Sequence, residues 1–62
     1  MYVIRRTDQG GGYVSKPGSQ LSYTRRLDRA QKYATREQAA ANMCEGNETI
    51  EDLERVLDVY RR

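Results

Sequence analysis

Arginines and tyrosines in the middle of the chain are the residues with the clearest potential to do chemistry. Arg25, Arg26 and Arg29 stand between Tyr23 and Tyr33. Tyr and Arg are frequent hot spots of protein interfaces, and the same pair can bind nucleic acid, with arginines on phosphates and tyrosines stacked on bases. We therefore predict a partner-binding face made of Arg25, Arg26, Arg29, Tyr23, Tyr33, Arg5 and Lys16. The plainer alternative is that the arginines form the solvated face of a small sheet and the tyrosines cap its core.

Residues suited to catalysis or metal binding are scarce. The chain has no His, so acid–base chemistry near neutral pH would fall to carboxylates or to Cys44, the one cysteine. The nearest carboxylate cluster, Glu48, Glu51 and Asp52, is explained by helix capping and the helix dipole. The Asp/Glu spacing does not match a calcium loop. We expect no catalytic residue, no metal and no cofactor, and hence a protein that is not an enzyme.

The glycine run at residues 10–12 could serve either as a turn or as a phosphate cradle. Bare backbone amides can approach an anion closely, but a phosphate loop normally leads into a helix N-terminus. Here the run is followed by Tyr13 and Val14, which have strand character. The sequence therefore favours a hairpin turn, and the phosphate cradle remains the alternative.

Charge is sorted along the chain. Residues 1–36 hold eight Lys/Arg and two Asp, whereas residues 37–62 hold three Arg and seven Asp/Glu, and the whole chain carries a net charge of only +2. Dedicated nucleic-acid binders of this size usually carry a larger positive excess, and an acidic tail would repel a phosphate backbone. We therefore predict first a host protein or a protein–nucleic acid complex as the partner, with direct nucleic-acid binding as the alternative. The same sorting could pair two copies of the chain, or pair Arg29 and Lys32 with the tail acids.

Sixty-two residues indicate a single small domain, residues 1–62, with a marginal core. A pocket deep enough to enclose a substrate would remove core, so recognition should use an exposed surface, and a homodimer would enlarge the core. Cys44 fits a reducing compartment and is expected to be a small buried thiol. The sequence contains no apolar run of membrane-spanning length and no signal-peptide pattern, which predicts a protein without membrane association, in the cytoplasm.

Strands are expected in the first third of the chain. Residues 2–7 and 13–16 predict a β-hairpin in which Tyr2 and Ile4 share one face, with Val3 and Arg5 on the other. After the turn signal Pro17-Gly18, residues 21–24 predict a short third strand. Residues 27–30 predict a helical turn, and an extended step follows through Lys32 and Tyr33.

Helices are expected in the second half. Thr35 at the N-cap with Gln38 three residues later forms a capping box, and the helix that it begins should stop at Gly46-Asn47, with Met43 and Cys44 on its apolar face. Apolar spacing over residues 49–60 predicts a second amphipathic helix, and a closing strand at residues 56–60 is the alternative. The predicted fold is α+β, a small antiparallel sheet (a hairpin plus a short third strand) packed by one or two helices.

Loosely spaced residues of the middle segment carry a resemblance, namely Tyr23, Thr24, Leu27, Ala30, Tyr33, Thr35, Gln38 and Ala39. Behind the short hairpin, the chain resembles small accessory proteins of tailed phages and prophages over about residues 2–40. Some such proteins are anti-defence, anti-CRISPR-like inhibitors. The resemblance implies a binding inhibitor or modulator of a host macromolecule, such as a bacterial defence complex, in the host bacterial cytoplasm, and it carries over no catalytic residue.

Overall fold

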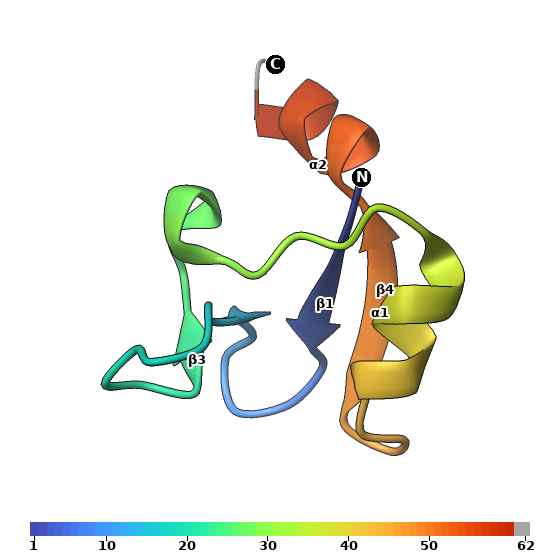
Figure 1. Cartoon of the computed structure of the whole chain (residues 1–62). Coiled ribbons are helices and arrows are strands. Elements are labelled where there is room, and N and C mark those ends of the chain that lie inside the picture. Colours follow the sequence, from blue (N-terminus) through green and yellow to red (C-terminus); the bar gives the residue numbers. More distant parts are fainter. Residues whose placement is uncertain (61–62) are drawn as a thin grey trace.

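The computed structural model describes residues 1–60 and has an antiparallel four-stranded sheet with two α-helices (Figure 1), which confirms the α+β class. The strands lie in the order β3-β2-β1-β4. Each pairs antiparallel with its neighbour. The elements in chain order are β1 (Tyr2–Arg6), β2 (Tyr13–Val14), β3 (Tyr23–Thr24), the 3-10 helix η1 (Leu27–Arg29), α1 (Arg36–Asn42), β4 (Glu48–Asp52) and α2 (Leu53–Tyr60).

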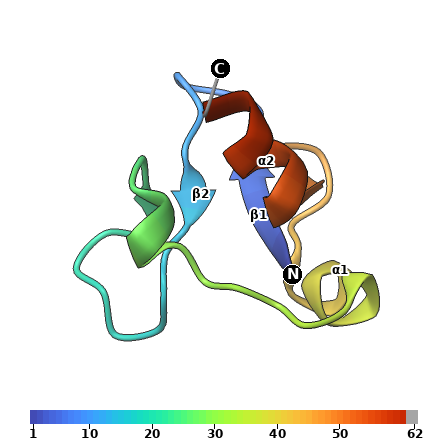
Figure 2. The same cartoon turned by 90° about the horizontal axis from the view of Figure 1, so that it is seen from above.

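The predicted hairpin and third strand are present. Arg5 of β1 pairs with Tyr13 of β2, and the Arg6 N–H donates to the Gly12 carbonyl at 2.7 Å to close the glycine turn. The predicted helical turn is η1, and the extended step after it runs antiparallel to β1, with Tyr2 and Tyr33 exchanging backbone hydrogen bonds of 2.8 Å. This segment links η1 to α1 across the N-terminal end of the chain (Figure 2).

Both faces of the sheet are covered at its centre. Val3 packs with Tyr13 and Ala30 on one face, where partly buried Leu27, Leu53 and Val56 from η1 and α2 extend the cluster. Ile4 points to the opposite face because side chains alternate along a strand, and α1 packs there against β1 and β4 with Ala39 fully buried. Val3 and Ile4 are therefore both fully buried, whereas Arg5 on the face of Val3 is exposed.

The first helix begins as predicted and ends early. The Thr35 hydroxyl accepts the Gln38 N–H at 3.2 Å, and the Gln38 side chain accepts the N–H of Ala34, one residue before the N-cap. The helix ends at Asn42 because Met43 turns to an extended conformation, so the predicted stop at Gly46-Asn47 is wrong. Cys44 therefore lies beyond the helix and is exposed, which makes the prediction of a buried thiol wrong as well.

The last third of the chain differs most from the prediction. Glu48–Asp52 form β4 and pair with the whole of β1, so a helix over residues 49–60 is wrong in its first part. The β-branched Thr49 and Ile50 suit a strand. The switch to helix comes at Asp52, whose carboxylate accepts the Glu54 N–H at 3.0 Å and caps α2. The alternative of a closing strand at residues 56–60 is also wrong, since this segment belongs to α2.

Candidate functional site

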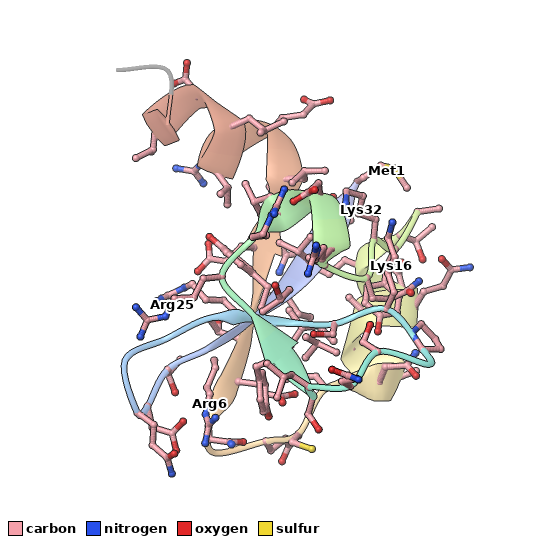
Figure 3. The ribbon with its side chains drawn as sticks, turned by 90° about the vertical axis from the view of Figure 1, so that its left-hand side faces the viewer. Met1, Arg6, Lys16, Arg25 and Lys32 are labelled. Atoms are coloured by element: carbon pink, nitrogen blue, oxygen red, sulfur yellow. The ribbon has the colours of Figure 1, made fainter. Side chains whose placement is uncertain are left out.

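The order of the strands places the basic and the acidic parts of the chain at opposite edges of the sheet. Residues 13–33, which hold β2, β3 and η1, carry five Lys/Arg and one Asp, whereas residues 36–60, which hold α1, β4 and α2, carry seven Asp/Glu and two Arg. Because β3 and β4 are the two edges of the sheet, positive charge collects at the β3 edge and negative charge at the β4 edge. We call the part formed by residues 13–33 the basic edge; Figure 3 looks onto this side of the molecule.

The predicted cationic residues fall into two groups, those that form an ion pair within the protein and those that do not. Arg5 donates from Nε to Glu51 Oε1 at 3.1 Å. Arg26 pairs with Asp28, with Nη2 and Oδ2 3.1 Å apart, and this hydrogen-bonded guanidinium lowers the pKa of the Asp28 carboxyl. Among residues 1–60, by contrast, the side chains of Lys16, Arg25 and Arg29 form no ion pair. Lys32 of the basic edge forms no ion pair in this range either, but its Nζ donates to the carbonyls of Leu27 and Ala30, which leaves the other three side chains available for a partner.

The three available cations form two groups on either side of β3. Arg25 directly follows β3 and lies on one side of it, whereas Lys16 lies on the other (Figure 3). The Lys16 N–H donates to the Arg29 carbonyl at 3.1 Å, which places these two residues on adjacent segments. Arg25 lies instead against the glycine turn, beside Arg5.

A hollow of about 260 Å³ adjoins the Lys16 and Arg29 side of the basic edge. Leu21 beside it is 72 % exposed, which makes it the most exposed of the large apolar side chains described. An exposed Leu next to an unpaired Arg combines an apolar anchor with a charge, as binding surfaces do. We call Lys16, Leu21 and Arg29 the docking patch. The hollow is lined by Ser15, Ser19, Gln20, Leu21, Tyr23, Thr24 and Arg29.

Leu21 is the site residue that the sequence reasoning assigned to another role, as part of a strand over residues 21–24. The strand begins only at Tyr23, so Leu21 remains in the loop before it. A sequence signal was present, because Leu21 is the one apolar side chain larger than Pro in the polar stretch between Lys16 and Ser22. Leu21, Ser22 and Tyr23 also alternate between apolar and polar as strand residues do, so the sequence pattern did not separate Leu21 from β3.

Tyr23 lines the same hollow, and its ring and hydroxyl are fixed by contacts with Arg6 and Glu48. The Arg6 guanidinium lies 4.5 Å from the centre of its ring, and its hydroxyl donates to a carboxylate oxygen of Glu48. The second oxygen of Glu48 accepts the Cys44 N–H at 2.8 Å. The hydrogen bond to Glu48, with a smaller contribution from burial, raises the pKa of Tyr23. Tyr23 thus ties β3 to β4 across the sheet.

Tyr33, the other predicted aromatic contact, is half-buried beside β1. Burial raises the pKa of its hydroxyl, with a smaller contribution from the negative charge of Glu48. Its backbone is fixed by the two hydrogen bonds to Tyr2. The structure therefore brings Tyr23 and Arg29 to one hollow, and it places Tyr33 in the strand-like segment that flanks β1.

The carboxylates of Glu48, Glu51 and Asp52 form hydrogen bonds within the folded protein. Helix capping accounts for Asp52 alone, whereas Glu48 and Glu51 lie on β4 and bind Tyr23 and Arg5, so the capping explanation of the whole cluster is wrong. Within residues 1–60, no group of three or more His, Cys, Asp or Glu side chains is placed to hold a metal ion. No helix in this range is long and apolar enough to cross a membrane.

Comparison with known proteins gives no relative: no family model, no curated protein and no solved structure matches the chain.

Proposed function

We propose that this protein is a non-enzymatic binding protein whose docking patch attaches to an acidic surface of a larger protein. The observation that carries the proposal is the highly exposed Leu21 beside the unpaired Arg29 guanidinium at the positively charged edge of the sheet. Leu21 would enter an apolar site on the partner, and Arg29 and Lys16 would meet carboxylates around it. Charge complementarity of this kind mainly steers association and sets specificity, and the buried anchor supplies the affinity.

A protein partner suits the tyrosines better than a nucleic acid does. Stacking on a base needs a free and movable ring, and one face of the Tyr23 ring is already occupied by Arg6 while its hydroxyl is bonded to Glu48. Tyr33 is half-buried against β1. Direct nucleic-acid binding through Lys16, Arg25 and Arg29 is the alternative, and it would rely mainly on phosphate contacts.

We further propose that the larger protein belongs to a host bacterium, in whose cytoplasm the chain inhibits or modulates a macromolecular complex, such as a defence system, as phage accessory proteins do. The support for this step is the residue spacing from Tyr23 to Ala39 together with the small size of the chain, which suits surface binding better than catalysis.

The test compares two arginine variants that change the net charge equally. Arg29→Glu alters the docking patch, whereas Arg55→Glu alters an exposed arginine of α2 in the acidic half. Tagged protein is used to capture partners from a nuclease-treated bacterial lysate, and the bound proteins are quantified by mass spectrometry. We expect a specific protein whose recovery falls at least tenfold with Arg29→Glu and stays within about twofold with Arg55→Glu, since an interfacial hot spot contributes 2 kcal/mol or more.

Leu21→Ser provides an uncharged check on the same patch and should also reduce capture of that protein. Equal recovery with all variants would contradict the docking patch. Capture only of nucleic acid, lost on nuclease treatment and steeply dependent on salt, would establish the alternative function. Capture only of a second copy of the chain would show self-association instead.

A further inference from the structure

The glycine turn and two arginines line a second, open hollow, and its Arg25 lies on the other side of β3 from Lys16 (Figure 3). It has a volume of about 260 Å³ and is lined by Arg5, Gly10, Gly11, Gly12, Tyr13 and Arg25. Liquid water occupies about 30 Å³ per molecule, so the hollow has room for a small anion with part of its hydration shell. Four segments, namely β1, the turn, the start of β2 and the residue after β3, contribute to its walls.

The backbone of the turn permits close approach of the Arg25 side chain. Gly10 and Gly11 have φ of +86° and Gly12 has φ of +111°, in the left-handed region that glycine adopts without strain. A Cβ atom added to Gly10 would lie 3.0 Å from Arg25 Nη2. The guanidinium of Arg25 therefore rests against bare backbone, and the absence of a side chain at Gly10 leaves it in place beside the hollow.

The charges around this hollow are not balanced by the protein. Among residues 1–60, the Arg25 side chain has no ion-pair or hydrogen-bond partner. Arg5 uses Nε for Glu51, and its two terminal nitrogens have no recorded acceptor in that range. Two guanidinium groups thus flank one hollow while a single carboxylate compensates them. Guanidinium groups bind phosphate oxygens through paired N–H donors, which makes such a site suited to a phosphate.

We propose that this hollow binds a single phosphate group, either inorganic phosphate or the terminal phosphate of a monoester, between the guanidinium groups of Arg25 and Arg5. A phosphate monoester carries close to two negative charges at neutral pH, which matches the two cations. A nucleic-acid backbone fits less well, because a chain of phosphates that continued past Arg5 would meet the carboxylate of Glu51. The site goes beyond the docking patch and does not rest on it.

The test is a titration of ¹⁵N-labelled protein with sodium phosphate at constant ionic strength, followed through the amide signals of residues 10–12. We expect saturable shifts of these signals, reproduced by phenyl phosphate. Arg25→Gln should weaken phosphate binding at least tenfold, whereas Arg29→Gln, which removes the same charge outside the hollow, should change it by less than about twofold. Absence of saturable shifts, or equal weakening by the two variants, would overturn the proposal.

Two glycines provide a second matched pair. Gly10 and Gly18 both have φ of +86°, so an Ala at either position imposes a similar backbone strain. A Cβ atom added at Gly10 would contact Arg25, whereas a Cβ atom added at Gly18 would have no atom within 4 Å. Gly10→Ala should therefore weaken phosphate binding and Gly18→Ala should not, and equal effects of the two changes would contradict the assigned geometry.

A titration with a short single-stranded oligonucleotide distinguishes the source of the phosphate. Weaker binding of the oligonucleotide than of phenyl phosphate is the expected result. Tighter binding, with shifts that spread to Lys16 and Arg29, would replace the single-phosphate site by a nucleic-acid surface. Absence of phosphate binding would not contradict the docking patch, because the docking patch is tested separately, by whether Arg29→Glu reduces the capture of a protein.

Discussion

Replacing Tyr23 by Phe removes one oxygen atom and with it the hydrogen bond to Glu48, while the ring can stay beneath Arg6. A hydrogen bond to a charged group contributes about 1.5–3 kcal/mol, and this one is half-buried, so water can partly replace it. The expected loss of stability is therefore about 1 kcal/mol. In a domain of this size that corresponds to a decrease of about 4–8 °C in the unfolding midpoint.

The assay is thermal unfolding followed by circular dichroism at neutral and at alkaline pH. Because the pKa of Tyr23 is raised in the folded protein, its bond to Glu48 stabilises the fold fully below the ordinary Tyr pKa of 10.0 and loses this effect as pH rises through the raised value. The wild type and Tyr23→Phe should therefore differ near neutral pH, and the difference should begin to shrink above about pH 10 and vanish above the raised pKa of Tyr23. Tyr33 also has a raised pKa and will lower the stability of both proteins together in this range.

Tyr2→Phe is the matched control, because it also removes one phenolic oxygen but no recorded hydrogen bond, and Tyr2 keeps its contact with Arg36 through the ring. Its effect should stay within about 0.5 kcal/mol. Equal midpoints for wild type and Tyr23→Phe near neutral pH, or a difference that does not change with pH, would refute the role assigned to the bond between Tyr23 and Glu48.

Three further substitutions or modifications test the fold. Thr35→Ala removes the N-cap of α1 and should lower the free energy of unfolding by about 1 kcal/mol in urea denaturation, whereas Thr35→Ser should retain most of it. Equal losses in the two variants would contradict the cap. Ile4→Val removes one methylene from a fully buried side chain and should cost about 0.5–1.5 kcal/mol, and no loss would show that the centre of the sheet is not closely packed. The Cys44 thiol is exposed and should react with a thiol reagent in the native protein at a rate close to that of the urea-unfolded chain. A rate at least tenfold slower in the native state would show that the thiol is protected after all.

The elements that were predicted correctly are those fixed by neighbouring residues. Thr35 and Gln38 define a helix start within four positions, and the hairpin of β1 and β2 follows from two strand-like runs on either side of three glycines. β4 could not be predicted in this way, because Ile50, Leu53 and Leu57 fit the spacing of a helix. The strand forms because β1 pairs over its whole length with residues 48–52, a contact between distant parts of the chain.

The sequence predicted which types of residue form the candidate site, but not which of these residues contact one another. Arginine and lysine content identified the basic edge, and the ion pair of Arg26 with Asp28 joins residues close in sequence. The bond from Tyr23 to Glu48 joins residues 25 positions apart, so its effect on the tyrosine could not be inferred from spacing. The placement of Arg25 against Gly10 is likewise a consequence of how the hairpin and β3 meet.

The most direct measurement of the central claim is hydrogen–deuterium exchange of the chain, free and bound to a protein captured after nuclease treatment. Binding through the docking patch predicts slower exchange in the bound state over residues 15–29, which include the patch, with little change in α1 and α2. Slower exchange confined to α1, β4 and α2 would place the partner on the acidic edge and contradict the claim.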